Sequence, residues 1–401
     1  MHRLLEAIPF RDPARARNEL AQLSESLAPG IQDRIESVLS LAADPDAALI
    51  YLGNLKQKQP AAFQKLSRSP LGLQYLTAVF SNSRFLADEL LQNPEWVEQL
   101  LASTDLHRVL SAEEYRHRLE EFAGPGRFEA LVPALFRRQQ ILRVVVRDVL
   151  GLCTLSEATE ELSNLADATL EVSYQRIRGE LLERHGVPLV PGTGEPCGFA
   201  VIALGKLGGQ ELNYSSDIDL MFVYGAPGET AGPASITNKE FFKKVANRLT
   251  ELLSTYTAEG VAYRVDLRLR PDGRLGEVLM SLEAAKQYYR TRARDWELQM
   301  MIKARVAAGD MRTGRYLLDF VEPLTYSTTL DFSAVEAISE TRERIGEKLA
   351  AANRRKAGKA GLDIKLARGG IRDIEFLVQC LHRGRRRMRR TLRSRFCKGE
   401  W

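Results

Sequence analysis

The sequence predicts an α+β protein that is predominantly helical, with one small sheet in its second half. Long stretches carry apolar residues at the three- and four-residue spacing of amphipathic helices, as in IQDRIESVLSLA at residues 31–42. Between residues 199 and 270, shorter segments have the length, composition and turn signals of strands. With 401 residues, 44% of them hydrophobic and 27% charged, the chain is long enough for two or three globular domains.

The helical pattern begins at the N-terminus, and we assign residues 1–122 to an N-terminal helical domain. Gly124-Pro125-Gly126 interrupts the pattern and marks a boundary. Two longer helices are expected after it, at Phe128–Gly151 and Ser156–His185, and Gly186 is a suitable C-cap for the second.

Three strand candidates follow a connector rich in Pro and Gly. Phe199–Leu204 is a short apolar run with turn signals on both sides, which is typical of a buried strand. DIDLMFVY (Asp217–Tyr224) and VAYRVDLRLR (Val261–Arg270) are the other two, and Asn238–Thr257 between them has the pattern of an amphipathic helix. From Ser281 onward the pattern is helical again.

The basic residues are concentrated at the end of the chain. His382–Trp401 holds nine Lys/Arg and one Glu, so the net charge of +5 comes from these residues and the rest of the chain is mildly acidic. We therefore expect no nucleic-acid partner, because a mildly acidic body offers no broad basic surface to bind one. We assign 123–330 to one domain and 331–380 to the start of a truncated C-terminal helical bundle, and we interpret 381–401 as an aberrant or disordered tail.

The ends and the cysteines indicate the compartment. The N-terminus has no apolar signal-peptide region, and no stretch reaches the roughly 18 apolar residues of a membrane span, so we expect a cytoplasmic protein without a membrane partner. The four cysteines are widely spaced and form no CxxC pair, which favours free thiols over a zinc site or a disulfide framework.

A Gly-rich turn follows the first predicted strand, and two acidic residues follow the turn. The segment from Gly205 to Leu220 reads GKLGGQELNYSSDIDL. Residues i and i+2 of a strand face the same side, so Asp217 and Asp219 are expected to project together. Two carboxylates so close repel each other unless a cation lies between them, and Mg²⁺ is a hard cation that prefers oxygen ligands.

A third acidic residue, Asp266, lies on the next predicted strand, where it would complete a site for two Mg²⁺ ions. Gly208 and Gly209 have no Cβ, so backbone N–H groups of the turn can approach phosphate oxygens. Three carboxylates, two Mg²⁺ ions and a glycine turn are the parts needed for in-line displacement at phosphorus.

This order of motifs resembles the polymerase-beta-like nucleotidyltransferase superfamily. Longer segments resemble the glutamine synthetase adenylyltransferase family, whose members are also called adenylyl-transferring/adenylyl-removing enzymes. These segments are YRVDLRLRPDGRLGEV (263–278), RDWELQMMIKAR (294–305) and KLARGGIRDIEFLVQ (365–379). The resemblance implies a polymerase-beta-like core, a small mixed sheet with helices, between an N-terminal helical domain and a C-terminal helical bundle.

Full-length members of that family have two nucleotidyltransferase halves. One removes AMP from a tyrosine of glutamine synthetase by phosphorolysis, releasing ADP, and the other adds AMP from ATP. This chain has room for one half, and ELNYSSDID, YRVD and RDWE resemble the N-terminal, removing half. The resemblance implies glutamine synthetase as protein substrate, phosphate and ADP or ATP as small substrates, and PII signal protein as a further partner. AMP transfer from ATP, or a non-catalytic module that binds glutamine synthetase or PII, are the alternatives.

The resemblance also implies roles for the acidic and small residues. Asp217, Asp219 and Asp266 would be the metal ligands and catalytic residues, and Gly208-Gly209 would be the turn that contacts phosphate. The superfamily usually has Gly-Ser at this turn, so a hydroxyl contact to phosphate is missing here. Ser216, or its neighbour Ser215, is our candidate to supply it.

Cations should line the site, because negative charge accumulates in the transition state of phosphorolysis. Arg268, Arg270, Lys303 and Arg305 are our candidates for binding the anionic groups. Arginine is suited to this because its guanidinium makes bidentate contacts to phosphate.

Overall fold

The computed structural model describes residues 8–24 and 30–326, together with a few single positions between 364 and 378. The tail predicted at 381–401, and all but those few positions of the predicted 331–380 bundle, therefore lie outside the described residues. The chain divides into two compact units. Of the described residues, one unit contains those up to 110 and 135–162, and the other contains 111–134 and those from 163 onward.

The first unit is helical, as the sequence predicts. Four of its helices begin with proline at their first position, where the fixed φ angle suits a helix and no N–H bond is lost. Asp44, Ser69 and Ser83 cap three helices by accepting hydrogen bonds from backbone N–H groups. The helices are α2 (Pro13–Ser24), α3 (Ile31–Ser40), α4 (Pro45–Lys58), α5 (Pro60–Arg68), α6 (Pro70–Asn82), α7 (Arg84–Gln92) and α8 (Glu95–Ala102).

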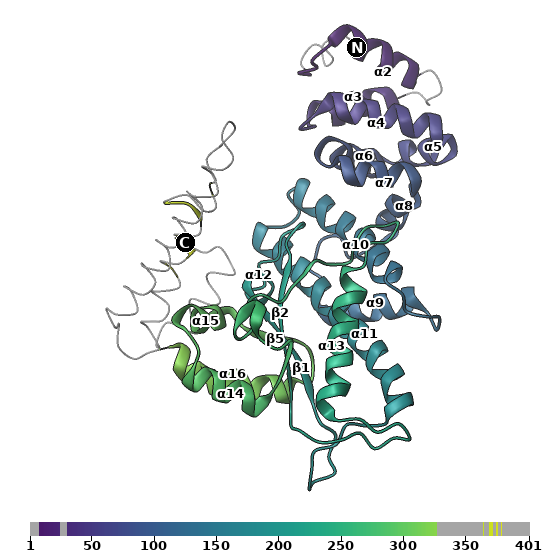
Figure 1. The fold of residues 1–401 in the computed structure, drawn as a ribbon. Coiled ribbons are helices and arrows are strands. Elements are labelled where there is room, and N and C mark those ends of the chain that lie inside the picture. The colour runs from purple at the N-terminus through teal and green to yellow at the C-terminus, as the bar shows by residue number, and fades with distance from the viewer. Residues whose placement is uncertain are drawn as a thin grey trace, which may run out of the picture. The chain divides into compact units, whose positions relative to one another are not determined.

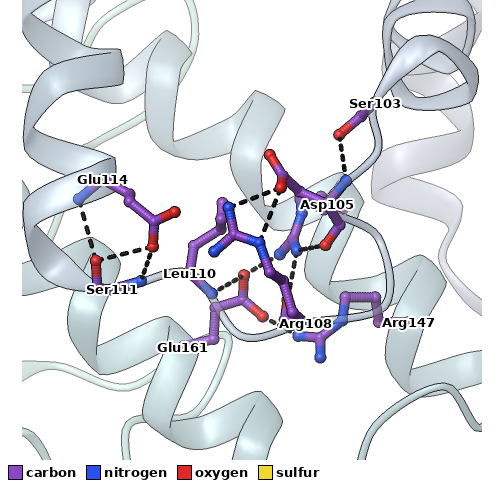
Figure 2. Close-up of polar contacts among 9 residues, drawn as sticks. Ser103, Asp105, Arg108, Leu110, Ser111, Glu114, Arg147 and Glu161 are labelled. Atoms are coloured by element: carbon purple, nitrogen blue, oxygen red, sulfur yellow. Dashed lines mark hydrogen bonds and ion pairs between the residues drawn. The ribbon is translucent and has the colours of Figure 1, made fainter.

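Two long helices, α10 (Leu131–Val149) and α11 (Leu155–His185), complete this unit and continue into the other. They are joined by a buried ion network, in which Glu161 of α11 pairs with Arg143 and Arg147 of α10. Figure 2 shows Glu161 between Arg147 and the backbone of Leu110, whose N–H donates to the carboxylate at 3.4 Å. Because these charged groups are removed from water, each depends on its partners.

The second unit contains a five-stranded mixed sheet. Its strands are β1 (Phe199–Leu204), β2 (Ile218–Tyr224), β3 (Val265–Asp266), β4 (Leu279–Ser281) and β5 (Arg305–Gly309). β2 pairs antiparallel with β1 and parallel with β3 and β4, while β1 also pairs antiparallel with β5. The α+β fold class with a small mixed sheet is therefore confirmed.

Helices cover both faces of this sheet (Figure 1). On one side lie α11 and α13 (Asn238–Ser254), and on the other lie α14 (Leu282–Thr291) and α16 (Met311–Thr325). On the first side, Phe199 stacks on Tyr174 of α11 and on Phe242 of α13. On the second side, Ile202 belongs to a buried cluster with Tyr289 of α14. The other helices of this unit are α9 (Ala112–Ala123), α12 (Gly205–Gly208) and α15 (Asp295–Met300).

One strand prediction was wrong in extent, and two strands, β4 and β5, were not predicted. The strand predicted over Val261–Arg270 has only two residues, because the carboxylate of Asp266 accepts a hydrogen bond from the backbone N–H of Arg268 at 2.8 Å and turns the chain. β5 was missed, since its sequence follows a helical pattern without a strong strand signal. No helix among the described residues has the length and apolar character that a bilayer span requires.

Candidate active site

The Gly-rich turn follows β1 directly and forms the short helix α12. It is closed by backbone hydrogen bonds, among them Glu211 N–H to the Lys206 carbonyl at 2.8 Å. A Cβ at Gly208 would collide with the carbonyl of Lys303, so the absence of a side chain lets two backbone segments meet. Gly209 is less enclosed, and the nearest atom to a Cβ there would be Cδ of Lys303, at 3.1 Å. The turn and Lys303 therefore form one surface.

The predicted acidic residues come together at one end of the sheet. Asp219 and Asp266 are register partners on the parallel strands β2 and β3, and Asp219 is also opposite Leu204 at the end of β1. Asp217 precedes β2 by one residue. A Cβ on Gly205 would clash with the Oδ2 atom of Asp219, which places this carboxylate directly against the Gly-rich turn.

Two of these carboxylates are engaged by arginines. Asp217 pairs with Arg264, whose guanidinium also donates to the carbonyl of Ser215. Asp266 accepts hydrogen bonds from Nε of Arg268 at 2.7 and 3.0 Å. Burial favours a raised pKa for Asp266, but the hydrogen bonds from the Arg268 side chain and backbone outweigh it, and the pKa lies below its ordinary value.

The donor set suits a hard cation, because carboxylate oxygens from adjacent strands are the ligands that Mg²⁺ prefers. Throughout residues 8–24 and 30–326, however, no three acidic, His or Cys side chains converge in a metal-binding arrangement. The backbone positions of Asp219 and Asp266 thus fit a metal site, whereas Asp217 and Asp266 point their carboxylates at arginines.

The predicted phosphate-binding cations fall into two groups: some lie at the site, and others hold the backbone around it. Arg268 contacts Asp266, and Lys303 lies beside the glycine turn, where its Nζ pairs with Glu211 at 2.6 Å. Arg270 instead donates to the carbonyls of Leu267 at 2.7 Å and Gly276 at 3.0 and 3.1 Å.

Arg305 is likewise engaged in the interior of its unit. Its guanidinium makes a bidentate pair with Asp167 of α11, at 2.6 and 2.9 Å, and donates to the carbonyl of Leu207 in the Gly-rich turn. Arg305 therefore connects the Gly-rich turn to helix α11. Ser216 is half-buried beside Asp217, and its backbone N–H closes a turn on Asn213. The phosphate-binding roles of all these residues stay predictions.

The loop after Arg270 is held by Glu297, a residue that the sequence places on a helix near the site but whose contacts it does not predict. Glu297, buried at the start of α15, accepts hydrogen bonds from the Tyr288 hydroxyl at 2.6 Å and from the backbone N–H of Asp272 at 3.2 Å. Asp272 has a left-handed backbone (φ +58°) and pairs with Arg292 at 2.9 Å. The Glu of the RDWE motif, Glu297, was the signal in the sequence that could have indicated this group, because a Glu that becomes buried needs hydrogen-bond partners.

The sequence of this chain matches known proteins over most of its length. Residues 73–319 match the family described as glutamate-ammonia ligase adenylyltransferase. The chain belongs to this family. Residues 339–394 also match the family described as GlnD PII-uridylyltransferase, and that match extends into the basic segment at the end of the chain.

Similar relatives carry the name bifunctional glutamine synthetase adenylyltransferase/adenylyl-removing enzyme. The protein of Pseudomonas putida is 38% identical over 324 residues, which cover 79% of this chain and 32% of the relative. The protein of Pseudomonas syringae pv. tomato is 34% identical over 365 residues, covering 87% of this chain and 36% of the relative. The chain thus spans about a third of the length of the relatives it matches.

Proposed function

We propose that this chain is a Mg²⁺-dependent nucleotidyltransferase that removes AMP from adenylylated glutamine synthetase by phosphorolysis. The observation that carries the proposal is the pairing of Asp219 with Asp266 beside the Gly-rich turn. The residues of the motifs ELNYSSDID, YRVD and RDWE favour the removing direction, and the name of the relatives includes that activity.

In the proposed reaction, an oxygen of inorganic phosphate attacks the α-phosphorus of the AMP-tyrosyl group. The bond between this phosphorus and the tyrosine oxygen breaks, its electron pair stays on that oxygen, and a proton from solvent restores the tyrosine hydroxyl. The products are ADP and unmodified glutamine synthetase. The reaction needs attacking and leaving oxygens in line and compensation of negative charge at phosphorus.

The residues of the site have distinct proposed roles. Asp217, Asp219 and Asp266 would hold two Mg²⁺ ions, which supply positive charge to the phosphate oxygens. The turn at Gly208-Gly209 would present backbone N–H groups to the phosphates. A second set would contact the anionic groups through side chains, namely Ser216, Arg268 and Lys303. Arg270 and Arg305 would support the site through the carbonyls and carboxylate that they bind.

A second candidate is AMP transfer from ATP to glutamine synthetase, because the name of the relatives includes both activities. The same metal and phosphate groups would serve this direction. We place either reaction in the cytoplasm, with PII signal protein as a further partner.

One pair of assays separates these candidates. The chain is incubated with adenylylated glutamine synthetase, phosphate and Mg²⁺, or with the unmodified enzyme, Mg²⁺ and ATP labelled at the α-phosphate. ADP release supports removal, and label on the protein supports transfer. Asp219→Asn should abolish the activity, while Asp319→Asn, on the exposed surface of α16, should leave it unchanged. Absence of both activities from the wild-type chain, or full activity of Asp219→Asn, would refute a catalytic role.

A further inference from the structure

Asp266 and its arginine partner are unequally exposed. The Asp266 side chain is 12% exposed, whereas that of Arg268 is 58% exposed. The carboxylate is fixed by its place on β3, where its register partner is Asp219 of β2. The guanidinium can therefore rotate into solvent at a small cost in free energy, whereas the carboxylate cannot.

Arg268 is the cation that contacts the acidic residues from the β3 side. Its Nε donates to both carboxylate oxygens of Asp266, at 3.0 and 2.7 Å, and Asp266 is the register partner of Asp219. A positive charge in this position relieves the repulsion among carboxylates, which is the task otherwise left to a metal ion.

We propose that Arg268 is an internal counter-cation, which neutralises the acidic residues in the metal-free protein and is displaced from Asp266 when a divalent cation binds. The inference rests on the metal site of the proposed function. It assigns the arginine contact to a resting state and explains why the backbone fits a metal site while the Asp266 side chain is turned to a guanidinium.

The exchange of Arg268 for a divalent cation at Asp266 has a direct consequence for the affinity of the protein for that cation. A metal ion entering the site must break the pair between Arg268 and Asp266, so the intact pair weakens metal binding. Exposed ion pairs are worth little in water, and we therefore expect removal of the guanidinium to tighten binding by about fivefold. The displaced arginine would then be available to phosphate oxygens.

Titration with Mn²⁺ as the probe, followed by electron paramagnetic resonance of the free ion, tests this without substrate or turnover. The proteins are the full chain and its Arg268→Gln, Arg268→Lys and Arg248→Gln variants. Arg248 pairs with Glu180 on the surface of the same unit and is the matched control. We expect Arg268→Gln to bind Mn²⁺ about fivefold more tightly than wild type, Arg268→Lys to lie between them, and Arg248→Gln to match wild type.

The outcomes separate the inference from the proposed function. Tighter binding by Arg268→Gln that disappears in the double variant with Asp266→Asn would support the exchange. Equal affinities of wild type and Arg268→Gln would overturn the exchange and leave the metal site standing. Failure of both proteins to bind Mn²⁺ would overturn the metal site and the exchange together. Arg268→Lys, which keeps the charge, provides the same comparison if Arg268→Gln does not fold.

Discussion

Gly205 determines where the Asp219 carboxylate can lie. Its φ angle of +55° is one that residues with a Cβ rarely adopt, and a Cβ there would collide with Oδ2 of Asp219. The residue therefore has two separable requirements, a backbone conformation and an open space. Only the second bears on the chemistry of the site.

Gly205→Ala should displace the Asp219 carboxylate and lower the rate of AMP transfer or removal by about 100-fold, since misplacement of a reacting group by an ångström has effects of that order. The control is Gly192→Ala, because Gly192 has a φ of +79° and open space around it. Both variants should lose about 1–2 kcal/mol of stability to backbone strain. Steady-state rates and urea unfolding check this, and a fully active Gly205→Ala protein would contradict it.

The pair between Asp266 and Arg268 predicts a pH dependence of stability. Hydrogen bonds from Arg268 overcome the effect of burial and lower the pKa of Asp266 below its ordinary value of 3.8. A carboxyl group whose pKa is lowered by folding contributes stability that is present above its unfolded pKa and is lost as pH falls through the folded pKa. In metal-free protein, the stability difference between wild type and Asp266→Asn should thus be constant from about pH 7 to 5 and shrink below about pH 4.

Urea unfolding of both proteins across this range is the measurement. Arg268→Gln is the control, because without the guanidinium the pKa of Asp266 should no longer be lowered. The difference between Arg268→Gln and its double variant with Asp266→Asn should therefore not shrink in the same way. A difference between wild type and Asp266→Asn that already declines between pH 7 and 5 would be inconsistent with the lowered pKa.

The loop that follows β3 depends on helix α15 for its shape. Glu297 accepts hydrogen bonds from Asp272 and Tyr288 through Oε1, and from the backbone N–H of Arg294 at 2.9 Å through Oε2. Arg270 closes the same loop through the carbonyl of Gly276. The loop is therefore a fixed element next to Asp266.

Glu297→Gln should destabilise the unit that contains the sheet by about 1–3 kcal/mol, because the new amide NH₂ would face the N–H of Arg294 and leave a buried donor without a partner. The rate of amide hydrogen exchange in residues 268–277 should rise in the same variant. Glu283→Gln on α14 is the control, since that side chain is 78% exposed and its pair with Lys286 is worth little. Unchanged exchange in the loop of Glu297→Gln would show that the loop does not depend on this carboxylate.

Local patterns predicted the elements of the molecule better than the contacts between them. The apolar run at Phe199–Leu204 and the long helix ending at Gly186 follow from composition and periodicity, and both were found. The pair between Asp167 and Arg305 joins residues 138 positions apart, and no spacing in the sequence encodes it. Arg268 was predicted as a phosphate ligand, yet its partner in this structure is Asp266, because the turn that the Asp266 carboxylate makes with the Arg268 backbone brings the two side chains together.

The buried network of the helical unit makes the most demanding prediction about the fold as a whole. Glu161 is fully buried and pairs with two arginines that are themselves buried. Arg143 also donates to the carbonyls of Asp105 and Arg108, so the network fixes the segment between α8 and α9. One carboxylate thus compensates two guanidinium charges.

Glu161→Gln should cost about 3–5 kcal/mol, because it leaves two buried charges without their carboxylate. Glu160→Gln is the control, since Glu160 neighbours Glu161 on α11 and is exposed. Loss of amide protection should be largest in residues 100–110 and 135–162, which the network joins, and smaller in the strands of the sheet. A Glu161→Gln protein within about 0.5 kcal/mol of wild type would mean that α10 and α11 are held by apolar packing alone, and that the ion network is dispensable for the fold.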